Sequence, residues 1–280
     1  MAEMLERIVR GAAAMRITNV CAAFALFVAA CGGGGSDDTD PGGGPTSVPP
    51  PPPTLPVVAD VTLLFMGNSH TSNNDLSTMV TDMVRDGTPG KTVASVEAPG
   101  WLFLDERLHD EATIDMLTSQ DWSFVILQAQ KYSSSGQFNY STEEAKELVR
   151  MSRDQHAIPV MFPEWPRQGI DESQRIYDLH VSIAQAEPAC VAPIPQAFDL
   201  ALARDPHLNL YAADGNHSSA AGAFLAALVL YATITEQSPL DVPPLPQFPV
   251  DESVQETLRG IAAEIVQTVP PRMWCPGDVG

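Results

Sequence analysis

The sequence predicts an α/β protein, a three-layer α/β/α sandwich around a central parallel sheet of about five strands. The first observation is that five short runs are apolar throughout, as in parallel strands that are covered on both faces. The second is that longer amphipathic stretches separate these runs. The expected strands are Val61–Met66, Thr92–Val96, Phe124–Leu127, Pro159–Phe162 and Cys190–Ala192.

Apolar residues recur with helical spacing between and after these strands. Ser141 and Glu144 have the capping-box spacing that marks a helix start. The apolar run after His217 is only about fifteen residues long and contains Gly222, so a buried core helix is expected there rather than a membrane span. The expected helices are roughly Leu76–Arg85, Asp105–Leu117, Ser141–Gln155, Glu172–Ala186, Ser219–Thr235 and Ser253–Val269.

Acidic residues dominate the charge of the chain. Its 280 residues include 35 Asp and Glu against 15 Lys and Arg, which gives a formal net charge of −20. Such a surface repels nucleic acid and anionic lipid headgroups, so neither is an expected partner of the folded domain. Once the N-terminal segments are set aside, the length leaves room for one large domain.

Residues 1–30 have the pattern of a secretory signal. A basic residue precedes the apolar run Val20–Ala30, which is too short to span a bilayer comfortably and ends in small residues. The run stops at Cys31, and Val-Ala-Ala-Cys resembles the bacterial lipobox, in which the Cys is acylated and becomes the mature N-terminus. We therefore expect a lipoprotein signal peptide, with Met15 as an alternative start to Met1.

The segment after the signal, residues 31–56, is rich in Gly, Pro, Ser and Asp and has almost no apolar content. It cannot bury enough surface to fold, and its five-proline run is expected to be stiff and extended. Gly32, rather than an acid, follows the Cys, which by resemblance to Gram-negative lipoproteins favours the outer membrane. The expected protein is therefore exported and held in the cell envelope by its lipid alone, with a tether before the domain at residues 57–280.

The first expected strand runs into Gly67-Asn68-Ser69-His70. A Ser at a strand-to-helix turn exposes its hydroxyl at the carboxyl edge of the sheet, where ligands bind in sheets of this type. The helix that follows points its N-terminal amides at the same place, which suits an anion. Alone, such a turn is a weak sign of catalysis, and a structural serine fits it as well.

Asp214 and His217 lie three residues apart, just before an expected helix. This spacing lets the carboxylate hold the imidazole Nδ1–H while Nε2 faces outward as a general base. A correctly held His activates a Ser hydroxyl that is otherwise a poor nucleophile. Taken separately, an Asp-Gly turn with a surface His is the simpler interpretation.

Together, the two motifs resemble the SGNH/GDSL hydrolases, serine esterases in which a Gly-Asp/Asn-Ser block near the N-terminus pairs with a later Asp-x-x-His block. The likeness runs from about Asp60 to Leu240, and FMGNSHT, DWSFVILQ and DGNHSSAAGAFLAALVLY resemble a bacterial branch with Asn in the first block. It implies a flavodoxin-like α/β/α fold and a catalytic triad of Ser69, Asp214 and His217.

The resemblance also implies an oxyanion hole. The backbone N–H groups of Ser69 and of Gly100, which follows the second expected strand, match two of the family's donors. The third donor is usually an Asn in a Gly-x-Asn turn, and here the turn reads Gln128-Ala129-Gln130. Gln130 stands at the Asn position and is the expected donor, with Gln128 as the alternative. Losing one such donor typically costs about a hundredfold or more in rate.

Other residues near these motifs have less specific roles. His70 is adjacent to Ser69, but neighbouring side chains diverge, so we expect His70 to shape the rim of the substrate pocket. Trp101 and Trp165 follow expected strands at the functional edge, where each either walls the pocket or simply packs. The remaining His residues on helical patterns are expected to be solvated or capping: His109, His156 and His180.

Four Cys are present, and two remain once the signal is removed and Cys31 is lipidated. These two, Cys190 and Cys275, are an even pair in an oxidising compartment, which suggests a disulfide between the last strand and the C-terminal tail. No His, Cys or carboxylate cluster has metal-ligand spacing, and no glycine-rich phosphate loop follows a strand. No metal and no cofactor is expected.

The sequence thus predicts a serine hydrolase that cleaves carboxylic esters through an acyl-enzyme. By analogy with relatives, the expected substrates carry small acyl groups such as acetyl, on carbohydrate. The altered Gln128-Ala129-Gln130 turn keeps open a non-catalytic SGNH-like binding or envelope lipoprotein. An acyltransferase that passes the acyl group to a sugar hydroxyl would use the same residues.

Overall fold

The structure, a computed structural model, describes residues 57–277. The expected signal peptide, Cys31 and the tether lie outside these residues. Within them, five strands form one all-parallel sheet in the order β2-β1-β3-β4-β5, which confirms the predicted fold class. The strands are β1 (Val61–Met66), β2 (Val93–Glu97), β3 (Phe124–Gln128), β4 (Ile158–Phe162) and β5 (Cys190–Val191).

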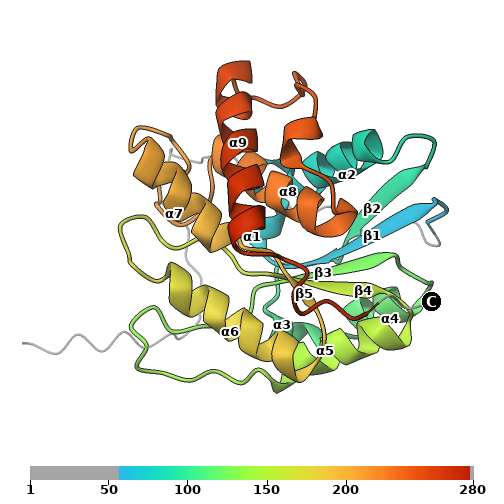
Figure 1. The fold of residues 1–280 in the computed structure, drawn as a ribbon. Coiled ribbons are helices and arrows are strands. Elements are labelled where there is room, and N and C mark those ends of the chain that lie inside the picture. The colour runs from blue at the N-terminus through green and yellow to red at the C-terminus, as the bar shows by residue number, and fades with distance from the viewer. Residues whose placement is uncertain (1–56, 278–280) are drawn as a thin grey trace, which may run out of the picture. The chain divides into compact units, whose positions relative to one another are not determined.

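Helices cover both faces of the sheet (Figure 1). One face packs against α2, α7, α8 and α9, and the other against α3, α4, α5 and α6. The helices are α1 (Ser69–Ser72), α2 (Leu76–Gly87), α3 (Leu104–Arg107), α4 (Glu111–Thr118), α5 (Glu143–Asp154), α6 (Ser173–Ala186), α7 (Ile194–Arg204), α8 (Ala220–Thr235) and α9 (Glu252–Thr268), with 3-10 turns at Asn73–Asp75 and Pro239–Asp241.

Burial on both faces explains why β1 is apolar apart from Thr62. Leu63 and Phe65 point into one core, while Leu64 and Met66 point into the other. Successive residues of a strand face opposite sides, so a strand covered on both faces favours apolar side chains at every position. The buried Thr62 is accommodated because its Oγ1 accepts from Ser123 N at 3.0 Å. The chain passes from β1 to β2 on one side and then to β3 on the other. In parallel sheets, a crevice opens at the carboxyl ends of the strands where the chain changes direction in this way, and ligands bind there.

Two helices differ from the expectation. The stretch expected as one helix at Asp105–Leu117 is split into α3 and α4, because the Asp110 side chain accepts a hydrogen bond from Thr113 N at 2.9 Å and starts a new helix. Helix α7 was not expected at all. Its Pro195 lies in the first turn, where the missing N–H of a proline costs no helical hydrogen bond.

Helix α8 is the central helix of its layer, and every side chain from Gly222 to Ile234 is buried. Among residues 57–277, no helix is long and apolar enough to cross a membrane. His180 differs from the expectation of a solvated side chain. It is 1% exposed, its Nδ1 lies 2.8 Å from the carbonyl oxygen of Ile176, and burial lowers its pKa to about 4.

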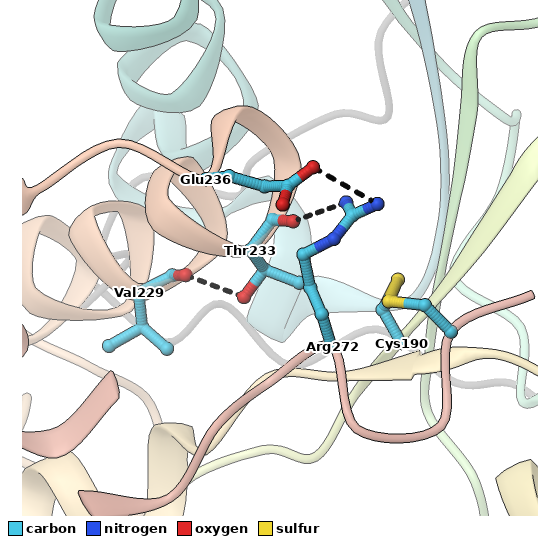
Figure 2. The surroundings of a disulfide bond; sticks show 6 residues. Cys190, Val229, Thr233, Glu236 and Arg272 are labelled. Carbon is cyan, nitrogen blue, oxygen red and sulfur yellow. Dashed lines mark hydrogen bonds and ion pairs between the residues drawn. A yellow bond between two sulfur atoms is a disulfide. The ribbon is translucent and has the colours of Figure 1, made fainter. Parts of the chain in front are cut away.

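The C-terminal tail is tied to the edge of the sheet. A disulfide joins Cys190 of β5 to Cys275, and Val191 N donates to Pro271 O at 2.9 Å. Figure 2 shows Arg272 reaching from the tail to the end of α8, where it donates to Thr233 O and pairs with Glu236. The tail therefore covers the open edge that the short strand β5 would otherwise expose.

Candidate active site

Ser69 is the first residue of α1, and only Gly67 and Asn68 separate it from the end of β1. The turn between them needs glycine, because a Cβ on Gly67 would lie 2.1 Å from Thr71 Oγ1. Asn68 caps α1, and its side-chain oxygen accepts from His70 N at 3.0 Å. The strand and the cap together present the Ser69 hydroxyl at the carboxyl edge of the sheet.

The structure brings Ser69, His217 and Asp214 together, although 148 positions separate the first two. Ser69 Oγ lies 2.8 Å from His217 Nε2, and His217 Nδ1 lies 2.5 Å from Asp214 Oδ2. A carboxylate can only accept, so Nδ1 carries the hydrogen and Nε2 is left to accept the Ser69 proton. The hydrogen bond from His217 holds the pKa of Asp214 well below its ordinary value, so Asp214 is ionised.

A small hairpin carries the Asp214–His217 turn. Tyr211 and Ser218 pair antiparallel at its base, and Asp214 Oδ1 accepts from the backbone N–H groups of Asn216 and His217, each at 2.9 Å. These bonds orient the carboxylate without any help from burial.

Trp165 supports this turn from below. Its Nε1 donates to Asn216 O at 2.8 Å, and its side chain is only 2% exposed. Trp165 therefore packs under the site and does not wall the pocket. This outcome matches the packing alternative that the sequence left open.

His70 lies beside His217. Its ring stacks on the His217 ring with centroids 4.9 Å apart and is tilted against Trp165 at 5.2 Å. Burial, and then the neighbouring His217, lower the pKa of His70 to about 4, so the ring is neutral near neutral pH. A neutral ring has one N–H, so it can donate either to Asn68 Oδ1 or to Asn216 O, each 3.2 Å away.

The backbone at Gly100 has φ +75°, a conformation that favours glycine. Gly100 follows β2, and its neighbour Trp101 lines the catalytic pocket with 39% of its surface exposed. The second proposed oxyanion donor therefore lies in the loop next to the Ser69 turn. These two loops follow β1 and β2, the first two strands of the sheet.

The two glutamine amides do not lie as expected. Gln130 Nε2 donates to the carbonyl oxygens of Lys131 and Ser141, each at 2.9 Å, which uses both of its hydrogens. The extra methylene, relative to Asn, lets this amide fold back onto its own loop. Gln130 therefore lines the pocket without offering the side-chain donor that the family pattern implied.

The buried side chain of Gln128 links two loops of the site. Its Oε1 accepts from Asn68 N at 2.9 Å and from Thr71 Oγ1 at 3.0 Å, while its Nε2 donates to Glu164 Oε2 at 2.7 Å. The side chain thus joins the turn that carries Ser69 to the loop after β4. A glycine at this position would leave that space empty.

Sequence reasoning missed Glu164 as a functional candidate, although its place directly after the fourth strand was a signal. Glu164 is one of the residues that line the pocket at Ser69 and His217, and burial raises the pKa of its carboxyl to about 7. A carboxyl that titrates near neutral pH in a cleft is a candidate for function.

The catalytic pocket is a cavity of about 630 Å³. Lys131 Nζ lies over the Phe103 ring at 4.9 Å and is paired with Asp105, which braces one wall. Within residues 57–277, no group of three or more His, Cys, Asp or Glu side chains could hold a metal ion. The lining residues are Asn68, Ser69, His70, Trp101, Phe103, Gln130, Lys131, Tyr132, Ser134, Tyr140, Glu164, Arg167, Asn216 and His217.

The pKa of Glu164 predicts a pH-dependent stability. Because its pKa rises from 4.5 to about 7 on folding, the folded chain keeps a proton that the unfolded chain has lost. Stability from this group is present below about pH 4.5 and falls, by on the order of 1–3 kcal/mol, as pH rises to about 7. Glu164→Gln should remove that fall.

Urea unfolding of both proteins across this pH window measures the difference. Glu256→Gln, which changes an exposed carboxyl on α9, is the matched control and should follow the unmodified chain. Parallel stability profiles for Glu164→Gln and the unmodified chain would contradict the prediction.

Several solved structures are similar to this chain, and two of them have TM-scores above one half. A protein assigned as an SGNH hydrolase from Slackia heliotrinireducens is 26% identical, with a TM-score of 0.51, over 62% of this chain and 98% of that one. A DUF4886 family protein from Bacteroides uniformis is 15% identical, with a TM-score of 0.56, over 76% and 96%. No protein-family model and no curated protein matches the sequence. The likenesses show a shared fold, and the first supports a hydrolase of that fold.

Proposed function

This chain has the SGNH hydrolase fold, and we propose that it is a serine hydrolase that cleaves carboxylic esters. The observation that carries the proposal is the chain of contacts from Ser69 Oγ through the His217 ring to the Asp214 carboxylate, at 2.8 and 2.5 Å. A Ser hydroxyl is a weak nucleophile until a held base takes its proton. Such a trio at the mouth of a cavity suits acyl transfer.

The reaction begins when His217 Nε2 takes the Ser69 proton and Ser69 Oγ attacks the ester carbonyl. The resulting tetrahedral oxyanion collapses, the bond to the alkoxy oxygen breaks, and the imidazolium gives its proton to the leaving alcohol. Water then repeats the cycle on the acyl-enzyme, with His217 as base, and releases the acid. Asp214 stays ionised and stabilises the imidazolium in both halves.

Backbone amides hold the oxyanion in this mechanism. The N–H groups of Ser69 and Gly100 supply the donors. The Gln130 amide is engaged with backbone carbonyls, so a donor from this side chain is not part of the mechanism. Two main-chain donors are enough for an oxyanion hole of the serine-protease kind.

Small acyl groups on a carbohydrate alcohol are the proposed substrates. Trp101, Phe103 and Tyr140 expose 39%, 38% and 48% of their surface at the pocket. Flat apolar rings interspersed with polar groups suit an alcohol that has both apolar faces and hydroxyls. These exposed rings could contact a substrate whose bulk lies outside the acyl site.

The functional test is hydrolysis of activated esters by the purified chain. Acetate esters should be cleaved faster than long-chain esters, and a fluorophosphonate should attach covalently to Ser69. Product formed on an added sugar acceptor, in place of free acid, would instead favour the acyltransferase. A chain that neither turns over nor is labelled would favour the binding lipoprotein.

We also propose that the chain is exported and anchored in the cell envelope by a lipid on Cys31, with no other membrane contact. The apolar run before Cys31 and the tether-like composition after it support this proposal. Cys31→Ala should abolish incorporation of radiolabelled fatty acid and release the protein from the membrane fraction. Unchanged labelling would rule out Cys31 as the anchor.

A further inference from the structure

Arg107 is a fully buried cation directly behind the proposed oxyanion site. It lies on the short helix α3, and its side chain has 0% of its surface exposed. Its two Nη groups lie within hydrogen-bond reach of four backbone carbonyl oxygens and one hydroxyl, which share four hydrogens, while the buried Nε has no partner among the described residues. The acceptors are Gly67 O, Ala98 O, Pro99 O, Gly100 O and Thr113 Oγ1.

These acceptors belong to two loops that meet at the site. Gly67 O lies in the turn between β1 and Ser69, while Ala98, Pro99 and Gly100 form the loop after β2. One nitrogen, Nη2, bonds both Gly67 O and Gly100 O. A single planar group therefore joins the two segments that carry the proposed oxyanion donors.

Arg107 itself is held in place. Helix α3 begins where Leu104 N donates to Ala129 O at 3.1 Å, in the turn after β3. The Glu106 side chain accepts from Phe103 N at 2.9 Å, which closes the first turn of the helix. The three loops at the carboxyl edge are thus linked through α3.

The charge is retained at neutral pH. Burial lowers the pKa of Arg107 to about 10, while Asp110 and Glu97 act in the opposite direction. Burying a cation costs several kcal/mol unless its donors are well satisfied. Here Nε has no partner among the described residues and no carboxylate of these residues is bonded to the guanidinium, so the fold bears part of that cost. Carbonyl oxygens lower that cost but do not neutralise the charge.

We propose that Arg107 is a positioning residue for the reaction. It sets the spacing between the Ser69 and Gly100 amides, and it holds a permanent positive charge behind the oxyanion that they bind. This inference rests on the proposed ester hydrolysis. Arg107 would then act on the oxyanion indirectly, from a buried position behind the two backbone amides that bind it.

The physical reason is preorganisation. Oxyanion donors help only if they already point to the place where charge develops, and a misplacement of about 1 Å can cost about a hundredfold in rate. Lysine has one nitrogen on a flexible stem and cannot bond carbonyls in a fixed fork, so it keeps the charge without the geometry.

The experiment compares Arg107→Lys and Arg107→Met in the full chain. We expect kcat for an acetate ester to fall about tenfold in Arg107→Lys and about a hundredfold in Arg107→Met, with KM nearly unchanged. Affinity for a boronate that mimics the tetrahedral state should fall in parallel with kcat/KM. Arg85→Lys, at an exposed ion pair with Asp82, is the matched control and should behave like the unmodified chain.

Hydrogen exchange supplies a readout that needs no activity. Peptides that cover residues 66–72 and 97–103 should exchange faster in both variants, while α9 keeps its protection. If Arg107→Met does not fold, Arg107→Lys alone decides. Unchanged exchange in these loops, or faster exchange with unchanged kcat, would overturn the proposal. An unmodified chain that cleaves no ester would overturn the proposed function, and exchange would still show separately whether Arg107 holds the loops.

Discussion

Ser69→Ala should lower kcat for an activated acetate ester by about 10⁴-fold or more, without loss of fold. The methyl group cannot form the acyl-enzyme, so only the oxyanion donors and substrate binding remain to assist water. The Ser69 hydroxyl is the group that lies 2.8 Å from His217 Nε2. Steady-state kinetics and fluorophosphonate labelling measure the effect, and both signals should disappear together.

The matched control is Ser182→Ala. Ser182 is an exposed serine on α6 whose hydroxyl bonds only Leu179 O. This variant should keep its activity and its labelling. Activity retained in Ser69→Ala would end the triad assignment, because no other serine in the described part of the chain is bonded to His217.

His217→Gln should cost about as much as Ser69→Ala, and Asp214→Asn about 10⁴-fold, both in kcat. An Asn amide that donates to Nδ1 would place the imidazole hydrogen on Nε2, where it can no longer accept the Ser69 proton. The backbone bonds from Asn216 and His217 to Oδ1 remain possible in Asp214→Asn, so the turn should keep its shape.

Non-additivity separates a triad from three independent residues. The double variant Ser69→Ala/His217→Gln should be no slower than either single variant, because residues that act as a unit fail together. His109→Gln, at an exposed position outside the pocket, is the control for loss of a histidine. Losses that multiply in the double variant would contradict a shared proton path.

Much of the fold was predictable because the burial of parallel strands is visible in composition. Expected and observed strand ends agree to within one residue, since a strand covered on both faces is apolar along most of its length. Helix boundaries were harder to predict where a single side chain determines them. Asp110 splits a helix that periodicity alone joins, and α7 begins at a Pro-containing stretch that resembles a loop.

The two parts of the candidate site differ in how much of their geometry the sequence alone predicts. Asp214 and His217 are close in sequence, so their spacing alone predicts the pairing that Oδ2 and Nδ1 make. Ser69 was linked to them only through a family resemblance. The prediction that the Gln130 amide is an oxyanion donor was wrong. With its extra methylene, the side chain reaches other acceptors, and one of them, Ser141 O, lies in a loop whose path no sequence pattern reveals.

By itself, the sequence determined the α/β class, the strands and the two short motifs, because these depend on residues that are neighbours along the chain. Only the tertiary structure decided that Gln128 links two loops of the site, that Trp165 lies beneath the site and that Arg107 bonds two loops at once. Each of these roles is a contact between segments brought together by the sheet. The energy of such a contact depends on packing around it, and no local pattern records that packing.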